Sequence, residues 1–219
     1  MAPVSRKARV FLVDDHPIMR LGLAEVINSE ADLEVCGEAG TMTEALTRIG
    51  ATLPDVAVID LALEEGTGWD LIAQLGSKHP EVKMLVSSMY EESLFAERAL
   101  RAGAMGFVNK RDALDRLVDA LREVLAGRVF FSPEVANRLL RSVAAGDARQ
   151  RDPIESLSAR ELEVLEWLGQ GLTTQQIARK LQLSPKTIES HREKLKMKLN
   201  LHNSAQLQQR AVQWVLEHR

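Results

Sequence analysis

The sequence contains a single cysteine, Cys36, among its 219 residues. One thiol cannot close a disulfide within the chain or build a metal site with cysteine partners. No apolar run approaches the roughly 18 residues of a membrane span, and the chain does not open on a charged and then apolar leader. These absences argue against a disulfide-stabilised or membrane-inserted protein and predict a soluble, cytoplasmic one.

A phosphate-binding glycine loop is also missing. No Gly-x-Gly-x-x-Gly follows the first apolar run, Val10–Val13. A dinucleotide-binding domain needs these glycines so that the backbone can approach a pyrophosphate closely. The sequence therefore excludes a nucleotide-binding Rossmann domain.

The charges are unevenly distributed along the chain, although the formal net charge is only −3. Residues 154–219 contain ten Lys and Arg against seven Asp and Glu, so this part carries +3 and the rest of the chain carries −6. The division predicts a cation as partner of the acidic part and a polyanion as partner of the basic part. A chain of this length with 45% hydrophobic residues is expected to form two modest domains.

The first part alternates short apolar, β-branched runs with amphipathic stretches. The runs predict strands at Val10–Val13, Leu33–Ala39, Val56–Asp60, Val82–Ser87 and Gly106–Asn109. The stretches between and after them predict helices at Pro17–Ser29, after the capping box Thr41-x-x-Glu44, and at Trp69–Ser77, Glu91–Ala102 and Arg111–Ala126. Five such units predict an α/β fold, a five-stranded, parallel, doubly wound sheet of the flavodoxin-like kind.

We expect this α/β domain to occupy residues 1–127, a partly helical linker residues 128–153, and a second domain residues 154–219. The linker combines a possible helix, Val129–Val143, with the small, charged and turn-forming segment Ala144–Pro153. From Leu157 on, the apolar spacing is helical, with breaks at Gly171, at 184–185 and around 200–203. The second domain is therefore predicted to be four helices without strands.

Polar residues stand at the carboxyl ends of the predicted strands. Asp14 and Asp15 follow the first strand, Asp60 ends the third, Ser88 follows the fourth and Lys110 follows the fifth. Strand ends of a parallel sheet meet in one crevice, where three carboxylates would repel each other unless a hard cation lay among them. Single aspartates after strands usually cap helices, but the whole ordered set favours a site for Mg²⁺ (or Mn²⁺). A carboxylate beside such an ion can attack a phosphorus centre, and Asp60 has the central position.

With these residues, Arg9 to about Gly127 resembles a response-regulator receiver domain, through Asp14-Asp15-His16-Pro17, Asp60, Gly68, Ser88 and Lys110. The resemblance implies that Asp60 accepts a phosphoryl group from a sensor histidine kinase. It further implies that Asp15, Asp60 and the Ala62 carbonyl hold the metal ion, with Asp14 acting through a metal-bound water. Lys110 would pair with the phosphoryl oxygens and Ser88 would donate a hydrogen bond to one of them.

The resemblance also assigns a switch role to Phe107, three residues before Lys110. Movement of Ser88 toward a phosphoryl group would open space for the Phe107 ring to rotate from solvent into the fold. A half-buried strand aromatic without a switch role is the alternative. Two departures from the family pattern, Glu64-Glu65 in place of Pro-Gly and Thr67 in place of Asp or Asn, affect the expected rates rather than the chemistry.

The second part has the pattern of a helix-turn-helix. Ser158 is a predicted N-cap, Gly171 ends the first helix, Thr173–Leu181 is a short second one, and Ser184-Pro185 starts the third. Early-turn residues of such a third helix meet base edges, and its Lys and Arg side chains favour a phosphate backbone. The candidate DNA contacts are Lys186, Thr187, Glu189, Ser190, Arg192, Glu193, Lys194 and Lys198.

Leu157–Gln213 resembles the LuxR-type helix-turn-helix of the NarL/FixJ family. The similarity lies in Leu-Ser-x-Arg-Glu-x-Glu-Val-Leu, Gln-Gly-Leu-Thr, Ile-Ala-x-x-Leu and Ser-Pro-Lys-Thr-Ile-Glu-Ser-His, which ends at His191. Relatives frequently have lysine where Glu189 and Glu193 stand, so these two carboxylates either accept from a cytosine amino group or face solvent. The resemblance makes the last helix, Ser204–Leu216, the dimer face, with Leu207, Ala211, Trp214 and Val215 as its apolar residues.

Together the two parts predict a phosphorylation-controlled transcriptional regulator that binds double-stranded DNA and forms a homodimer when phosphorylated. Two alternatives remain. A phosphorylation-independent DNA-binding regulator would use the first domain only to dock a protein. A Mg²⁺-dependent phosphohydrolase would need a further acid or base after Asp60, which the sequence does not offer, so an enzyme is not expected.

Overall fold

The computed structural model describes residues 6–137 and 153–217, apart from Glu64, Gly66, Glu91 and Ala113. The chain divides into two compact units, Met1–Ala145 and Gly146–Arg219. Most of the predicted linker lies outside the described residues, but residues 133–137 are helical. None of the described helices is long and apolar enough to cross a membrane.

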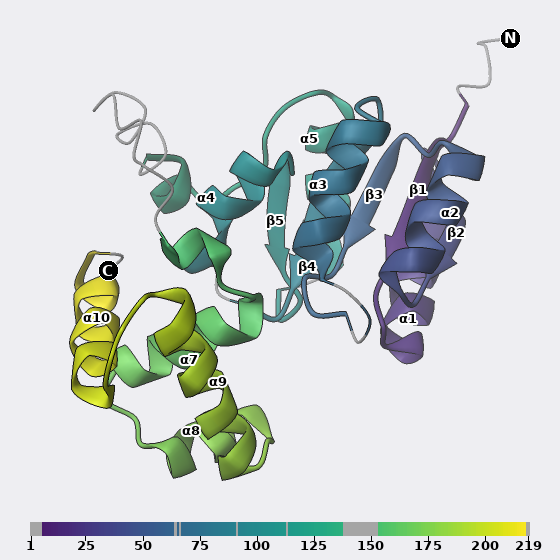
Figure 1. Ribbon diagram of the computed structural model, residues 1–219. Coiled ribbons are helices and arrows are strands. Elements are labelled where there is room, and N and C mark those ends of the chain that lie inside the picture. Colours follow the sequence, from purple (N-terminus) through teal and green to yellow (C-terminus); the bar gives the residue numbers. More distant parts are fainter. Residues whose placement is uncertain are drawn as a thin grey trace, which may run out of the picture. The chain divides into compact units, whose positions relative to one another are not determined.

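A five-stranded parallel sheet forms the centre of the first unit (Figure 1). Its strands are β1 (Ala8–Val13), β2 (Leu33–Ala39), β3 (Val56–Ile59), β4 (Lys83–Ser88) and β5 (Gly106–Asn109), in the order β2-β1-β3-β4-β5. Each predicted run is a strand, which confirms the flavodoxin-like arrangement. The order reverses between β1 and β3, and ligands of such sheets bind beyond the carboxyl ends of the strands at this point.

Five helices cover the two faces of the sheet, namely α1 (Pro17–Ser29), α2 (Met42–Thr52), α3 (Gly68–Lys78), α4 (Glu92–Ala102) and α5 (Leu114–Leu125). Helices α1 and α5 contact each other, whereas α3 contacts both α2 and α4. One face therefore carries α1 and α5, and the other carries α2, α3 and α4 (Figure 1).

Local hydrogen bonds define where two of these helices begin. The Thr41 hydroxyl accepts from the Glu44 backbone N–H, 3.2 Å away, so the predicted cap is confirmed. The Glu44 carboxylate accepts from the Gly40 N–H rather than from that of Thr41 itself. At α3, Thr67 is the N-cap and accepts from the Asp70 N–H. Threonine thus performs the capping role that Asp or Asn would have at this position.

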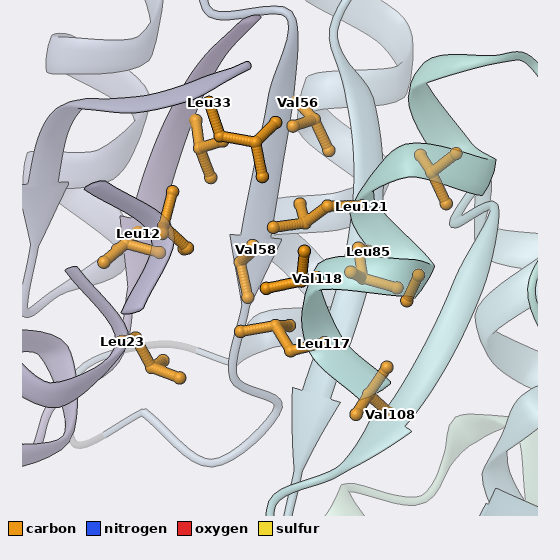
Figure 2. Close-up of a cluster of buried hydrophobic side chains, with 14 residues drawn as sticks. Leu12, Leu23, Leu33, Val56, Val58, Leu85, Val108, Leu117, Val118 and Leu121 are labelled. Carbon is orange, nitrogen blue, oxygen red and sulfur yellow. The ribbon is translucent and has the colours of Figure 1, made fainter. Parts of the chain in front are cut away.

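The core under α1 and α5 follows the two-residue period of the strands. Val10 and Leu12 belong to it, whereas the intervening Phe11 points to the other face and lies against Gly37. Figure 2 shows Leu117, Val118 and Leu121 of α5 lying over strand residues of this face. Leu121 is fully buried.

Beyond α5, the chain returns to the open edge of β5. Phe130 forms an isolated parallel bridge with Gly106. Its N–H donates to Met105 O at 2.9 Å, and its carbonyl accepts from the Phe107 N–H at 3.0 Å. We call residues 128–132 the edge segment, because they run along this border of the sheet and pair with it at Phe130.

The described part of the second unit contains a 3-10 turn, η1 (Pro153–Ser156), and the helices α7 (Ala159–Gly169), α8 (Thr174–Leu181), α9 (Pro185–Lys198) and α10 (Ser204–Glu217). The four predicted helices are confirmed, with no strand among residues 153–217. Ser158 and Glu161 form the capping box of α7, and Ser184 caps α9 with Pro185 in its first turn. A Cβ on Gly169 would lie 2.3 Å from the Ala211 carbonyl oxygen, so only glycine permits the close packing of α7 on α10.

Replacement of Leu121 by alanine is expected to lower the free energy of unfolding of the first unit by about 2–5 kcal/mol, because it removes buried methyl groups and leaves a cavity. Leu21→Ala, at a position that is 70% exposed, is the control and should change it by less than about 0.5 kcal/mol. Native-state hydrogen exchange of β1 and β3 amides measures both values. Equal effects of the two substitutions would contradict this description of the core.

Candidate functional site

Two buried carboxylates lie at the carboxyl ends of β1 and β3. Asp14 is 2% exposed and Asp60 is 3% exposed. The Asp60 N–H donates to Val13 O at 2.8 Å, which continues the pairing of β1 with β3 by one residue and places both side chains in the same crevice. One ligand atom each from Asp14, Asp15, His16 and Asp60 lies within 4.8 Å of all the others.

Lys110, which follows β5, reaches into this crevice. Its Nζ lies 2.5 Å from Asp14 Oδ2 and 2.5 Å from Asp60 Oδ2, and its side chain is only 4% exposed. Burial alone would lower the pKa of Lys110, but the attraction of Asp60 and Asp14 outweighs it and raises that pKa. Burial also raises the pKa of Asp60, more than Lys110 lowers it. The lysine therefore stays charged, whereas its burial makes the charged form of Asp60 costly without a further cation.

The donor set fits a hard divalent cation. Asp14, Asp15 and Asp60 supply carboxylate oxygens, which are the ligands that Mg²⁺ prefers. Three carboxyl groups share one lysine here, and a bound divalent cation compensates such a gathering of acids. His16 adds a nitrogen beside them, with Nδ1 2.6 Å from Asp15 Oδ1, and its side chain is 71% exposed. Sequence reasoning treated His16 only as part of a motif and missed this contact.

The loop after β3 positions the Asp60 carboxylate. The Ala62 N–H donates to Asp60 Oδ1 at 3.1 Å. A Cβ on Gly68 would lie 2.2 Å from the Asp60 carbonyl oxygen and 2.6 Å from Leu61 Cα, so a larger residue would displace the loop that carries the carboxylate. Glu64, which with Glu65 forms one of the two departures from the receiver pattern, lies outside the described residues.

Ser88 and Phe107 lie in the interior of the first unit. Ser88 is 0% exposed, and its Oγ has no hydrogen-bond partner among the described residues. Phe107 is also 0% exposed, so the solvent-facing starting position predicted for its ring is not the one in this structure. A phenylalanine ring has no hydroxyl to keep in water, and its burial is favourable.

The third helix of the second unit, α9, presents two unpaired cations. Lys186 and Lys194 are exposed and form no hydrogen bond or ion pair with the residues that the structure describes. Ser190 and Glu193 are exposed too, and Glu193 pairs with Lys196 at 2.9 Å. Thr187 lies at the helix start, where its N–H donates to Ser184 Oγ.

Glu189 and Arg192 bind residues of their own unit. The Thr174 hydroxyl donates to Glu189 Oε1 at 2.7 Å, and Arg192 Nη1 donates to Thr174 Oγ1 at 2.7 Å. Arg192 Nη1 also lies 3.5 Å from Glu189 Oε1. These bonds tie α9 to the first turn of α8.

Lys198 has a structural partner as well. Its Nζ lies 2.7 Å from Glu161 Oε2 and donates to Ser156 O at 3.2 Å. Burial would raise the pKa of Glu161, but Lys198 and the Ser158 N–H outweigh it and lower that pKa. Lys198 is therefore not the free cation that its place in the predicted contact set implies.

Each of the two units matches a known protein family. Residues 10–122 match the family of response regulator receiver domains, and residues 155–211 match the bacterial regulatory proteins of the luxR family. The chain belongs to the response regulators with a LuxR-type DNA-binding domain.

Relatives of this response regulator cover nearly all of it. The DNA-binding transcriptional activator DevR/DosR of Mycobacterium tuberculosis is 36% identical over 90% of this chain and 91% of its own. The transcriptional regulatory protein UhpA of Salmonella typhimurium is 36% identical over 92% and 96%. The structure of RcsB from Salmonella enterica serovar Typhimurium, bound to a promoter in the presence of the phosphomimetic BeF3-, has a TM-score of 0.57 at 28% identity and covers 94% of this chain and 98% of that one.

The last helix of the response regulator differs from its predicted role in one respect. Leu207, Ala211, Trp214 and Val215, expected as exposed dimer residues, are buried, from 0% to 8% exposed. They form the core of the second unit where α10 packs on α7. The exposed large apolar residues of α10 among those described are Val212 and Leu216, at 38% and 69%.

Replacement of Lys198 by methionine should destabilise the second unit by about 1–3 kcal/mol, because it leaves the buried Glu161 carboxylate without its cation. Lys194→Met removes the same charge from the same helix and should have little effect on stability. Native-state hydrogen exchange of α7 and α9 amides would decide between them. A response regulator in which both variants exchange like the wild type would not use Lys198 as a structural cation.

Proposed function

We propose that phosphorylation of Asp60 switches this response regulator, which binds double-stranded DNA through α9 and forms a homodimer when phosphorylated. The observation that supports this most directly is the buried crevice in which Lys110 Nζ lies 2.5 Å from both Asp14 and Asp60. A carboxylate, a lysine and a cluster of further acids in one buried crevice suit phosphoryl transfer to a protein side chain.

The metal in this proposal is Mg²⁺, or Mn²⁺, held by Asp15, Asp60 and the Ala62 carbonyl, with Asp14 acting through a water. When bound, the ion would offset negative charge on the transferring phosphoryl oxygens. Two features bear on its affinity. His16 lies close enough to Asp15 to compete for its carboxylate. The exposed Glu65, a departure from the receiver pattern, adds a negative charge to the loop after β3.

In the transfer step, an Asp60 carboxylate oxygen attacks the phosphorus of a phosphohistidine on a sensor histidine kinase. A P–O bond forms to Asp60 while the P–N bond to the kinase imidazole breaks, and that imidazole leaves with its electron pair. Lys110 pairs with the phosphoryl oxygens. Ser88, whose Oγ has no partner among the described residues, donates a hydrogen bond to one of them.

The proposal also covers the domain boundaries, the location of the protein and its DNA contacts. We place the receiver at residues 1–127, the linker at 128–153 and the DNA-binding domain at 154–219, in a cytoplasmic regulator that is not an enzyme for external substrates. Its relatives are transcriptional regulators. Within α9, Lys186 and Lys194 are the proposed phosphate contacts, and Thr187, Ser190 and Glu193 lie on the same exposed side or at the helix start.

The protein incubated with Mg²⁺ and a small phosphodonor should gain the mass of one phosphoryl group and bind DNA more tightly in a mobility-shift assay. Asp60→Ala should gain no phosphoryl group, because the nucleophile is lost. Asp119→Ala, which removes an exposed aspartate from α5, is the matched control and should behave like the wild type. Phosphorylation without a change in affinity would support the docking alternative, and an unmodified wild type would contradict the phosphoacceptor role.

Lys194→Ala should weaken binding to a random-sequence DNA duplex and reduce the slope of log K against log salt by about 0.9, the value for one lost phosphate contact. The free Lys194 ammonium is available for such a contact, whereas Lys198 is bound to Glu161. Lys198→Ala should therefore leave the slope within about 0.3 of the wild-type value. Identical slopes for Lys194→Ala and the wild type would remove Lys194 from the proposed contacts.

A further inference from the structure

The edge segment, residues 128–132, is held to β5 by backbone and side-chain contacts. Besides the two hydrogen bonds of Phe130 with Met105 and Phe107, the Phe130 ring packs partly buried against the core cluster. Gly106 leaves room for this approach, since a Cβ there would lie 2.9 Å from Phe130 O and 3.1 Å from Phe130 Cβ. The edge of β5 is thereby covered by the start of the chain segment that leaves the sheet.

A second attachment joins the edge segment to α4. The Ser132 N–H donates to Glu92 Oε1 at 2.7 Å. Glu92 lies in the first turn of α4, its side chain is only 15% exposed, and its Oε2 lies 4.0 Å from Arg116 Nη2 on α5. A hydrogen bond from a backbone N–H to a largely buried carboxylate is strong. The edge segment can therefore move away from α4 only if this bond breaks.

The same turn of α4 is close in sequence to Ser88. Three residues separate Ser88 from Glu92. The loop between them is tied to the end of β5, because Asn109 Nδ2 donates to Tyr90 O at 3.0 Å and the Lys110 N–H donates to Ser88 O at 2.9 Å. Ser88 and Tyr90, at the start of this loop, are therefore both bonded to the end of β5.

We propose that Glu92 is a positioning residue that couples Asp60 to the edge segment. In the unphosphorylated protein it holds Ser132 and keeps residues 128–132 paired with β5. When Ser88 moves to a phosphoryl oxygen on Asp60, the Glu92–Ser132 bond breaks and the edge segment loosens from β5. This inference rests on the proposed function, because it needs Asp60 to be phosphorylated, and it adds the step by which the change reaches the chain beyond the receiver.

The test is residue-resolved hydrogen exchange of the Phe107 and Phe130 amides in the full chain, with intact mass recorded on the same samples. Incubation with Mg²⁺ and a small phosphodonor should raise both exchange rates at least about tenfold in the wild type. In Glu92→Ala both rates should be high without phosphorylation and should change less than about twofold with it, because the attachment is already lost.

Glu97→Ala is the matched control, since it removes a carboxylate from α4 whose ion pair among the described residues is with Arg101 of the same helix. It should respond like the wild type. The Val58 amide in central strand β3 reports whether Glu92→Ala remains folded and should stay protected throughout.

A wild type that gains the phosphoryl mass but keeps slow Phe107 and Phe130 exchange would overturn the coupling. Glu92→Ala that exchanges like Glu97→Ala would also overturn it. A wild type that gains no phosphoryl mass would instead contradict the proposed function, and in that case a high basal exchange in Glu92→Ala would still support the holding role of Glu92.

Discussion

The two contacts of Lys110 with Asp14 and Asp60 are the constraint on which the first unit depends. Buried carboxylates are costly unless a cation and hydrogen bonds compensate them, and removal of one partner leaves the other uncompensated. Here the three charges come from the ends of β1, β3 and β5. The compensation therefore requires the strand order β2-β1-β3-β4-β5, which sets these three ends around one crevice. The strand order of the sheet thus determines both the fold of this unit and the position of the candidate site.

Features that depend on residues close in sequence were predictable. Thr41, Ser158 and Ser184 cap the helices that they were expected to cap, because a cap involves residues only two or three positions apart. The strands were predictable from their apolar runs, and the acidic crevice was predictable from the polar residues that follow the strands. Its members lie far apart along the chain, but the parallel sheet makes their meeting a topological necessity.

Contacts between side chains on different helices were not predictable in this way. Thr174 and Glu189 are fifteen residues apart, and Lys198 and Glu161 thirty-seven, and no periodicity relates them. The apolar residues of α10 were misjudged because periodicity reveals an apolar face but not how much of it the neighbouring helix covers. Phe107 was misplaced since a family role suggested an exposed ring where the strand environment is apolar.

These internal contacts reduce the number of positive charges on α9 that are available to a polyanion. Five cations lie between 186 and 198, yet three of them, Arg192, Lys196 and Lys198, bind carboxylates of the same unit. The charge that remains for a polyanion is concentrated in Lys186 and Lys194. The electrostatic footprint of α9 is thus narrower than its composition implies, and part of its basic character serves to hold the helices together.

The start of α9 carries a consequence of its own. Gln182, at the end of α8, has a left-handed backbone with φ 55°, and two residues later Ser184 and Pro185 begin α9. A helix advances by about 100° of rotation per residue, and the burial of Ile188 and Leu195 fixes which side of α9 faces the rest of the unit. The cap at Ser184 sets where along the other side the charges begin, so that Lys186 lies in the first turn and Lys194 about two turns further on. A residue added to the turn would therefore bulge out of it and leave Lys194 on its present face, because the two buried side chains hold the rotation of the helix.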